Sequence, residues 1–298
     1  MWLILGGTGQ LGMSLSKVLT ERKIDFVAWG SQELDIQSSE LCLQRIQSLS
    51  PSVIFNAAAW TDVDGAETNQ DEAYAVNALG ALNLAKSAKS VSAIFIQIST
   101  DYVFSGKSDV PWKVDDLRAP ATVYGSTKAA GEVAVMSEYP ERSYIFRTAW
   151  LYSPWGKNFV KTMVKIALSG ESEVKVVDDQ VGQPTSALDV ANQIVDSVNA
   201  HLPFGIYHAT NTGHANWYEF AQEIFKLVGS SGDRVLPIHS SSYTRPAVRP
   251  SFSVLDHDGW LEVSTSGVMI PKMRDWHIAL EDSIHAISAM VEAKGEES

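Results

Sequence analysis

The sequence predicts an α/β protein with a doubly wound parallel sheet, followed by a smaller C-terminal α/β lobe. In the first half, short apolar runs alternate with amphipathic stretches, and a glycine-rich turn follows the first run. Strands that are apolar along their whole length are typical of a sheet buried on both faces. Regular alternation of strand and helix implies parallel strands joined by crossover helices.

The elements of the first half follow in chain order. The expected strands are Leu3–Leu5, Phe26–Trp29, Val53–Asn56, Ala93–Ser99 and Tyr144–Arg147. Amphipathic spacing predicts helices between them. These helices are Gln10–Glu21, Glu40–Leu49, Glu72–Lys89 and Val123–Ser137.

The pattern becomes less regular after about Trp150, where loops lengthen and short strands mix with helices. We expect residues 1–150 to form a nucleotide-binding domain and residues 151–298 to form mainly a substrate-binding lobe, with a segment near 171–200 returning to the first domain. The expected strands here are Lys175–Val177 and Ile206–Ala209. The expected helices are Phe159–Leu168, Ala187–Asn199, Tyr218–Val228 and Leu280–Val291.

The glycine-rich turn lies between the first strand and the first helix. Residues 6–12 read Gly-Gly-Thr-Gly-Gln-Leu-Gly, which contains both G-x-x-G-x-x-G and G-x-G-x-x-G spacing. Glycine permits close approach of a pyrophosphate to the backbone, and the helix N-terminus supplies free amides. A glycine triplet alone is compatible with a turn that binds nothing. Its place between strand and helix predicts a dinucleotide site of the Rossmann type.

The second strand leaves the choice between NADH and NADPH open. It ends at Trp29-Gly30-Ser31, without the acidic residue that binds a ribose 2′-hydroxyl or the arginine that favours NADP. Asp35 and Ile36 follow a few residues later, and we expect them near the adenine.

Tyr124 and Lys128 form a Tyr-x-x-x-Lys pair on the helix predicted over 123–137. Residues four apart share a helical face, so the phenol and the ammonium are expected side by side. A phenol has an unperturbed pKa of about 10, and a neighbouring positive charge lowers it. Tyr124 is therefore expected to protonate a carbonyl oxygen as hydride arrives. Lys128 is also placed to hold the nicotinamide ribose.

Thr100 closes the fourth predicted strand within Ser99-Thr100-Asp101. Ligands bind at the carboxyl ends of parallel strands, so the hydroxyl is expected to hydrogen-bond a substrate carbonyl. Tyr-x-x-x-Lys pairs arise by chance on many helices, and a threonine here can simply cap a strand. The order and spacing of the three motifs together predict a ketoreductase.

Composition excludes several other classes. The formal net charge of −12 argues against a broad nucleic-acid surface. No Cys/His cluster has zinc spacing, and the single cysteine, Cys42, excludes an internal disulfide. No apolar stretch approaches the ~20 residues of a membrane span. We expect a cytoplasmic protein with no metal, membrane or nucleic-acid partner.

An ordered set of motifs resembles the extended short-chain dehydrogenases, and within them the dTDP-4-dehydrorhamnose reductase family. The resemblance runs from the glycine turn nearly to the C-terminus. Its further carriers are Leu34–Ile36, Asn56–Asp64, Ala66-Glu67, Val76-Asn77, Ser99–Phe104, Tyr124–Lys128, Arg147–Trp150, Asn158-Phe159, Asp179–Thr185, Arg249-Pro250 and Ser253–Asp256.

The resemblance implies that NADPH or NADH reduces dTDP-4-dehydro-L-rhamnose to dTDP-L-rhamnose. It implies catalytic roles for Thr100, Tyr124 and Lys128. Its cofactor positions match Gly6, Gly9, Gln10, Leu11, Gly12, Asp35, Ile36, Ala57, Ala58, Ala59, Tyr124 and Lys128. Its substrate positions match Val63, Asp64, Thr100, Asp101, Tyr124 and Trp150, with Trp150 either packing on the sugar or base or filling the core.

Two departures from the family pattern bear on function. Some members dimerise around magnesium through a glutamate early in the first helix, and the matching residue here is Ser14. A hydroxyl cannot replace a carboxylate for a hard cation, so we expect a monomer or weak homodimer without a magnesium link. Tyr102 stands where related sugar-nucleotide dehydratases have a glutamate, which favours simple reduction.

Two alternatives stay open. The first is a 4-ketoreductase for another nucleotide deoxysugar, because pocket shape selects the sugar while the chemistry is shared. The second is a non-catalytic, NADP-binding regulatory subunit, because the resemblance extends to the beta subunit of methionine adenosyltransferase. The intact Thr100, Tyr124 and Lys128 weigh against the second alternative.

Overall fold

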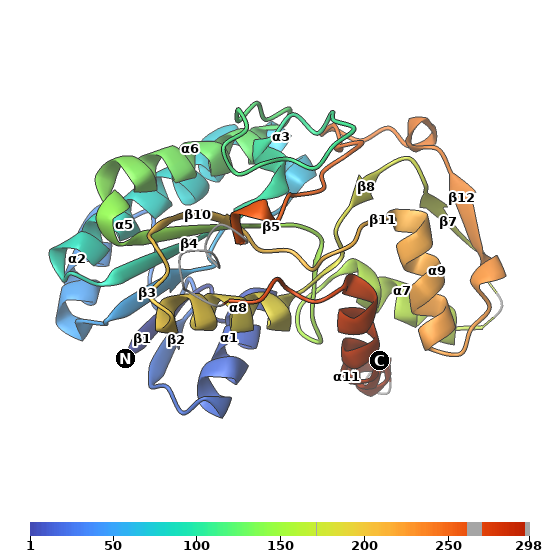
Figure 1. The fold of residues 1–298 in the computed structure, drawn as a ribbon, viewed down its shortest axis with the longest axis horizontal. Coiled ribbons are helices and arrows are strands. Elements are labelled where there is room, and N and C mark those ends of the chain that lie inside the picture. The colour runs from blue at the N-terminus through green and yellow to red at the C-terminus, as the bar shows by residue number, and fades with distance from the viewer. Residues whose placement is uncertain (171, 261–269, 296–298) are drawn as a thin grey trace.

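The computed structural model describes residues 1–170, 172–260 and 270–295, and its centre is a six-stranded parallel sheet (Figure 1). The strand order is β10-β5-β4-β3-β1-β2. The chain places β2 on one side of β1 and then continues on the other side, which confirms the doubly wound parallel sheet. The strands are β1 (Trp2–Leu5), β2 (Phe26–Trp29), β3 (Val53–Asn56), β4 (Ile94–Thr100), β5 (Ser143–Thr148) and β10 (Gly205–His208).

Alternate strand residues face two opposite helix layers. Ile4 and Phe55 pack under α1 and α8, whereas Leu3 and Ile54 pack under α2, α5 and α6. Both faces of the sheet are therefore buried, which is why its strands are apolar along their whole length. The bounds of these helices are α1 (Gln10–Glu21), α2 (Ser39–Leu49), α5 (Gly80–Ser90), α6 (Val123–Glu138) and α8 (Ala187–Asn199).

The single helix expected over 72–89 is divided into segments. After the short helix α3 (Val63–Thr68), α4 (Gln70–Tyr74) leads into a π-helical turn, Ala75–Leu79, before α5 begins. Asn77 lies in that turn, accepts from the amide of Trp60 at 2.9 Å and donates to Thr127 Oγ1 at 3.0 Å. The turn is thereby joined to the segment after β3 and to α6, a placement typical of π turns beside functional sites.

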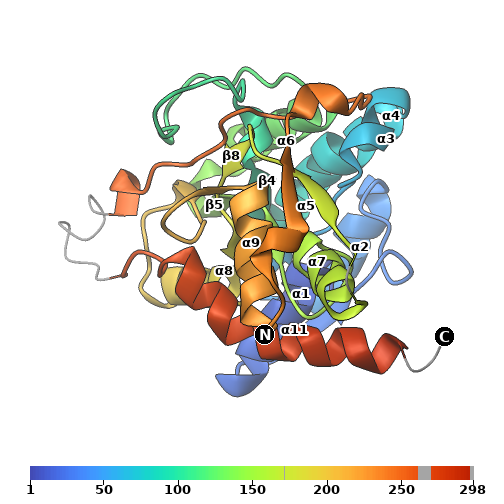
Figure 2. The ribbon, with the colours of Figure 1, turned by 90° about the vertical axis from the view of Figure 1, so that its right-hand side faces the viewer.

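The second lobe is built from short strand pairs and three helices in the described part of the chain (Figure 2). Its core includes Phe220 and Trp276, whose ring centroids lie 5.6 Å apart with the ring planes nearly perpendicular. The paired strands are β6 (Leu151–Tyr152) with β9 (Thr185–Ser186), β7 (Val174–Val177) with β12 (Val235–Ile238), and β8 (Val181–Gly182) with β11 (Ala215–Asn216). The helices are α7 (Phe159–Leu168), α9 (Trp217–Leu227) and α11 (Trp276–Gly295).

Short 3-10 turns lie in both lobes. Those beside the central sheet are Asp101–Val103 and Pro140–Arg142, and those in the second lobe are Gly232–Arg234 and Ser240–Ser242.

Two late segments return to the central sheet. Helix α8 packs beside α1, and β10 pairs with β5 in parallel. The strand expected over 206–209 in the smaller lobe is therefore an edge strand of the central sheet. Of the segment expected to return near 171–200, α8 does so, whereas β7 pairs with β12 in the second lobe. Composition predicts that a short run is a strand but carries no information on its pairing partner.

Gly12 packs in the first turn of α1 directly against the glycine turn. A Cβ on Gly12 would lie 2.3 Å from the Gly6 carbonyl oxygen and 2.8 Å from Gly7 Cα. Because neither backbone can yield without displacing β1 or α1, we expect Gly12→Ala to lower the free energy of unfolding by about 1–3 kcal/mol in a urea titration. Gly232→Ala is the control, since its Cβ would meet only Gln222, at 3.8 Å or more. Equal losses in the two variants would contradict the close approach.

Candidate active site

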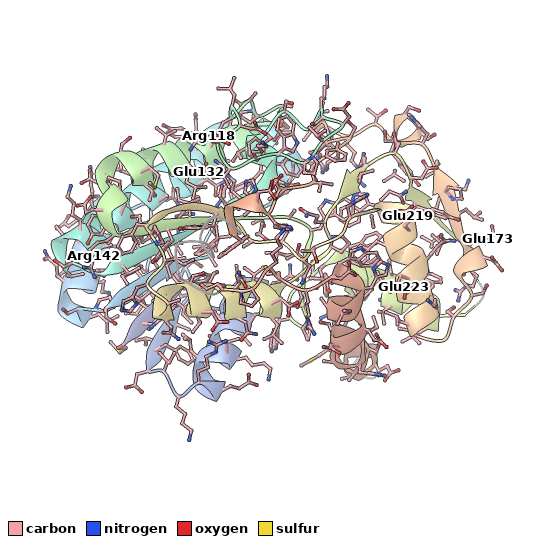
Figure 3. The ribbon with its side chains drawn as sticks, in the orientation of Figure 1. Arg118, Glu132, Arg142, Glu173, Glu219 and Glu223 are labelled. Carbon is pink, nitrogen blue, oxygen red and sulfur yellow. The ribbon has the colours of Figure 1, made fainter. Side chains whose placement is uncertain are left out.

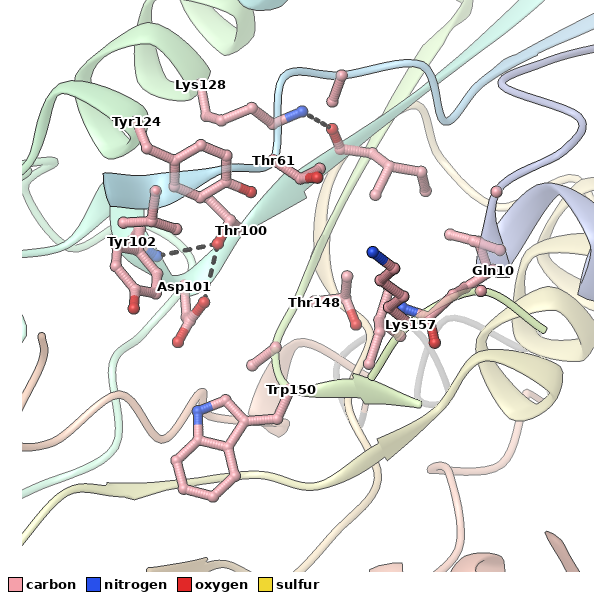
Figure 4. A pocket seen from close by; sticks show the side chains of 18 of the residues that line it. Gln10, Thr61, Thr100, Asp101, Tyr102, Tyr124, Lys128, Thr148, Trp150 and Lys157 are labelled. Carbon is pink, nitrogen blue, oxygen red and sulfur yellow. Dashed lines mark hydrogen bonds between the residues drawn. The ribbon is translucent and has the colours of Figure 1, made fainter. Parts of the chain in front are cut away.

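A cleft runs along the carboxyl edge of the central sheet, between the sheet and the second lobe (Figure 4). Its volume of about 1510 Å³ exceeds the ≈ 300–1,000 Å³ of a pocket for one small ligand. The glycine turn, the ends of β3, β4 and β5, helix α6 and loops of the second lobe line it. The cleft therefore has room for two ligands, as a transfer between a cofactor and a substrate requires.

The glycine turn forms one end of this cleft. Gly9 is the N-cap of α1, and no side chain caps the helix, so the amides of its first turn are free to bind an anion. Gly6, Gly9, Gln10, Leu11 and Gly12 all line the cleft. Because Gly6, Gly9 and Gly12 carry no side chain, a dinucleotide diphosphate can approach the backbone here.

The wall beside the glycine turn is made of small and apolar residues. Ala57, Ala58 and Ala59 follow β3 and line the cleft, as do Asp35 and Ile36 from the loop after β2. Ile36 is buried against α5, whereas Asp35 is exposed. The residues present fit a nicotinamide dinucleotide.

Gln10 joins the two lobes at this end of the cleft. Its Oε1 accepts hydrogen bonds from Asn158 Nδ2 at 2.9 Å and from Ser153 Oγ at 3.3 Å. Both donors belong to the loop that precedes α7. The side chain of Gln10 is therefore used between the lobes, which leaves its backbone amide for a cofactor.

Strand β4 ends in a buried pair formed by Thr100 and Asp101. Thr100 Oγ1 donates to Asp101 Oδ1 at 2.8 Å and accepts from the amide of Tyr102 at 3.2 Å (Figure 4). The hydroxyl of Thr100 therefore donates to the Asp101 carboxylate, and its expected contact with a substrate carbonyl stays a prediction. Burial raises the pKa of Asp101 to about 6, with hydrogen bonds from Ser253 and Thr100 acting in the opposite direction.

Tyr124 faces this pair from the first turn of α6, with its ring edge-on to Tyr102 at 5.5 Å. Burial raises the pKa of Tyr124 to about 12, a hydrogen bond with Thr100 lowers it, and the charge of Asp101 raises it further. The expectation that the motif lysine lowers this pKa is therefore wrong for this structure. The phenol keeps its proton at neutral pH, as a proton donor must.

Lys128 lies one turn after Tyr124 and is buried. Its Nζ donates to the carbonyl oxygen of Ile98 at 2.6 Å, so the ammonium contacts β4 and not the phenol (Figure 4). Burial lowers the pKa of Lys128 to about 8, and the charge of Glu132 opposes this. Lys128 also lines the cleft, where it can donate to a ribose hydroxyl.

Glu132, one turn further along α6, is fully buried and paired with Arg147 and Arg118; Figure 3 labels Glu132 and Arg118. It accepts from Arg147 Nε at 2.8 Å and Nη2 at 2.7 Å, and from Arg118 Nε at 2.7 Å. Burial alone would raise the pKa of Glu132, but the bonds and charge of Arg147, assisted by Arg118, hold it below its usual value. Arg147 also donates to the carbonyl of Val114 at 2.8 Å. The network joins α6 to β5 and to the loop before α6.

Val63 and Asp64 take different positions at the start of α3. Val63 lines the cleft. Asp64 accepts from Arg249 Nη2 at 2.8 Å and from the amide of Ala247 at 3.1 Å. Asp64 therefore holds the loop over residues 244–250 beside the cleft.

Trp150 lines the cleft just after β5, in a left-handed backbone conformation with φ of +45° that few non-glycine residues adopt. Its indole stacks on that of Trp217 at 3.5 Å, with 9° between the ring planes. Trp217 comes from the N-terminus of α9, and it also lines the cleft. Because one face of Trp150 is already covered, a sugar or base meets the pair of indoles and not Trp150 alone.

Four cationic residues of the second lobe line the cleft and were not predicted from the sequence. They come from separate loops and strands that only the tertiary structure brings together, and the one that lies in a quoted motif, Arg249, was given no role from the sequence. In a chain of net charge −12, this local excess of positive charge indicates an anionic ligand. The four residues are Lys157, Lys175, Arg245 and Arg249.

Ser14, at the position where some family members hold magnesium, is buried within α1 and donates to the carbonyl of Gln10 at 2.9 Å. Across residues 1–170, 172–260 and 270–295, no group of three or more His, Cys, Asp or Glu side chains is placed to hold a metal ion. Over the same ranges, no helix combines the length and the apolar character needed to span a bilayer.

The parallel sheet, the glycine turn at the start of α1, and Tyr124 and Lys128 beside Thr100 define an extended short-chain dehydrogenase, an NAD(P)-dependent oxidoreductase. The comparison with known families identifies the branch. The family model described as "RmlD substrate binding domain" matches residues 1–289, and the chain belongs to this family.

Several similar proteins are named as reductases of dTDP-linked sugars. A dTDP-4-dehydrorhamnose reductase of Streptomyces griseus is 42% identical over 290 residues, covering 96% of this chain and 93% of that protein. A dTDP-4-keto-6-deoxy-D-glucose reductase of Streptomyces niveus is 38% identical over 288 residues, covering 97% of this chain and 98% of that protein. The crystal structure of a dTDP-4-dehydrorhamnose reductase from Bacillus anthracis in complex with NADP matches with a TM-score of 0.89 and 35% identity. The match covers 95% of this chain and 98% of that chain.

Asp101 provides a pH-dependent test of this site. Its pKa in the folded protein, about 6, lies above the ordinary value of 3.8, so ionisation destabilises the fold. This cost is absent below about pH 4, grows as pH rises to about 6 and is constant above that. We expect the Tm of Asp101→Asn relative to the parent to increase between pH 4 and pH 7 in thermal denaturation. Asp115→Asn, at an exposed aspartate, is the control. A difference in Tm between Asp101→Asn and the parent that does not change with pH would refute the raised pKa of Asp101.

Proposed function

We propose that this protein reduces the 4-keto group of a dTDP-activated deoxysugar with NADH or NADPH, and that the substrate is dTDP-4-dehydro-L-rhamnose, which becomes dTDP-L-rhamnose. One observation carries this proposal: a protonated phenol, Tyr124, faces Thr100 in a cleft whose other end is a diphosphate-binding glycine turn. The names of the Streptomyces griseus and Streptomyces niveus relatives, both reductases of dTDP-linked keto sugars, support the choice of substrate class.

When bound, the reduced dinucleotide supplies the hydride. Tyr124 donates its proton to the keto oxygen, because burial keeps the phenol protonated until a stronger base forms beside it. Thr100 orients Tyr124 through a hydrogen bond that lowers the pKa of the phenol and so favours the phenolate left after proton transfer. Lys128 holds α6 against β4 through the carbonyl of Ile98 and lines the cleft, where its ammonium is placed to donate to a ribose hydroxyl of the dinucleotide. In this scheme Thr100 and Asp101 position the donor.

The second lobe is suited to the nucleotide part of the substrate. Lys175, Arg245 and Arg249 line the cleft and supply charge for the diphosphate of a dTDP-sugar. The stacked Trp150 and Trp217 offer an apolar surface for the sugar or the base. A dTDP-sugar therefore fits this side of the cleft, while the glycine turn is left to the dinucleotide.

A second candidate is a 4-ketoreductase for a different dTDP-deoxysugar. The Streptomyces niveus relative, whose name specifies dTDP-4-keto-6-deoxy-D-glucose, is nearly as similar to this chain as the Streptomyces griseus relative. The same side chains would protonate either sugar, and the pocket wall near Trp217 would distinguish them. A panel of keto-sugar nucleotides, compared by kcat/KM, separates the two candidates.

We also propose a cytoplasmic enzyme that does not dimerise through magnesium. The burial of Ser14 supports the second part, because a buried hydroxyl bonded within its own helix presents no ligand to a shared cation. Sedimentation with and without a chelator tests it, and a chelator-sensitive dimer would contradict it.

Tyr124→Phe tests the chemistry. We expect kcat to fall by about 10²–10⁴-fold, because the variant lacks the proton donor, with NADPH and NADH affinity unchanged. The assay follows dinucleotide oxidation in the presence of dTDP-4-dehydro-L-rhamnose, and binding is measured separately by fluorescence. The control is Tyr139→Phe, a buried tyrosine at the far end of α6. Turnover of Tyr124→Phe at the parent rate would overturn the mechanism.

A further inference from the structure

The loop after β2 returns a carboxylate to the end of that strand. Glu33 Oε2 accepts a hydrogen bond from the amide of Gly30 at 2.7 Å. Gly30 directly follows β2 and lines the cleft. A Cβ added to Gly30 would lie 3.3 Å from Glu33 Oε2 and 3.9 Å from the side chain of Thr8. The Glu33 carboxylate therefore lies at the edge of the cleft, against Gly30, which lines the cleft together with Thr8 of the glycine turn.

That part of the cleft is where Rossmann folds recognise the adenosine ribose. A carboxylate at the end of the second strand accepts the 2′-hydroxyl of NAD, whereas an arginine there binds the 2′-phosphate of NADP. The sequence has Gly30-Ser31 at the strand end, so spacing alone assigns neither role. The backbone amides of Glu33 and Leu34 donate hydrogen bonds to the Gly30 carbonyl and close a turn over residues 30–34. This turn places the acidic side chain of Glu33 at the end of β2.

The charges that the glycine turn and the loop after β2 contribute have one sign. The cleft-lining residues contributed by 6–12 and 30–37 include Asp35 and no lysine or arginine. The cations that line the cleft come from α6 and from the second lobe, namely Lys128, Lys157, Lys175, Arg245 and Arg249. Residues 6–12 and 30–37 therefore offer no cation to a 2′-phosphate, and Glu33 already occupies the Gly30 amide that could otherwise donate to it.

We propose that Glu33 makes this cleft selective for NADH over NADPH, by accepting the ribose 2′-hydroxyl and repelling a 2′-phosphate. The inference rests on the proposed function in that a dinucleotide lies against the glycine turn. It sets this chain apart from the Bacillus anthracis relative, which was crystallised with NADP. A carboxylate close to a doubly charged 2′-phosphate repels it, and we expect this repulsion to weaken NADPH binding about tenfold or more relative to NADH.

The test measures Kd for NADH and NADPH by fluorescence titration, with the parent and with Glu33→Gln. Glutamine keeps an oxygen for the Gly30 amide and removes only the charge. We expect the parent to bind NADH at least about tenfold more tightly, and Glu33→Gln to reduce that ratio about five- to tenfold, mainly by strengthening NADPH binding. Because the effect is electrostatic at an exposed site, 0.5 M salt should shrink it.

Glu21→Gln is the matched control, with the same charge change at the far end of α1, about 18 Å from Gln10. Its ratio of Kd values should equal that of the parent. Ser31→Arg is the converse variant and should shift the preference towards NADPH, because it places a cation at the strand end. NADPH bound as tightly as NADH by the parent, or a ratio unchanged in Glu33→Gln, overturns the inference alone. Binding of neither dinucleotide overturns the proposed function as well.

Discussion

The buried ion pair between Glu132 and Arg147 holds the site in register. It joins α6, which carries Tyr124 and Lys128, to β5, and the bond from Lys128 to the Ile98 carbonyl joins the same helix to β4. Removing one partner of a buried pair typically costs about 3–5 kcal/mol, because the other is left charged in a dry environment. Helix α6 therefore cannot shift along the sheet without breaking a charged contact. The distance between the phenol and the end of β4 depends on that constraint.

Charge is distributed unevenly along the cleft. Free amides of α1 lie at the glycine end, where the loop after β2 adds the carboxylates of Glu33 and Asp35. Lys157 lies beside Gln10 at this end, whereas Lys175, Arg245 and Arg249 line the cleft from other parts of the second lobe, with Arg249 held by Asp64 (Figure 4). In a protein of net charge −12, these local groups provide the positive potential that the proposed anionic ligands require.

The pair formed by Thr100 and Asp101 shows how the fold accepts a cost in stability at a functional position. A buried carboxyl with a pKa near 6 is mostly ionised at neutral pH, and the cost of burying that charge disfavours folding. In return the carboxylate accepts from Thr100 and fixes the hydroxyl that lies beside Tyr124. Such opposed effects on stability and function are common at active sites.

The sequence by itself determined the doubly wound sheet, the glycine turn and the candidate Tyr124–Lys128 pair, because each depends on neighbours a few residues apart: strand–helix alternation, a strand–turn–helix junction and one helical turn. It misjudged the effect of Lys128 on the phenol, since burial and the contact with Ile98 are not encoded in spacing. Only the tertiary structure decided the position of β10, the stacking of Trp217 on Trp150, the cations of the second lobe and the return of Glu33 to Gly30. These features depend on loop conformation and on contacts between segments far apart in the chain, which local sequence periodicity does not predict.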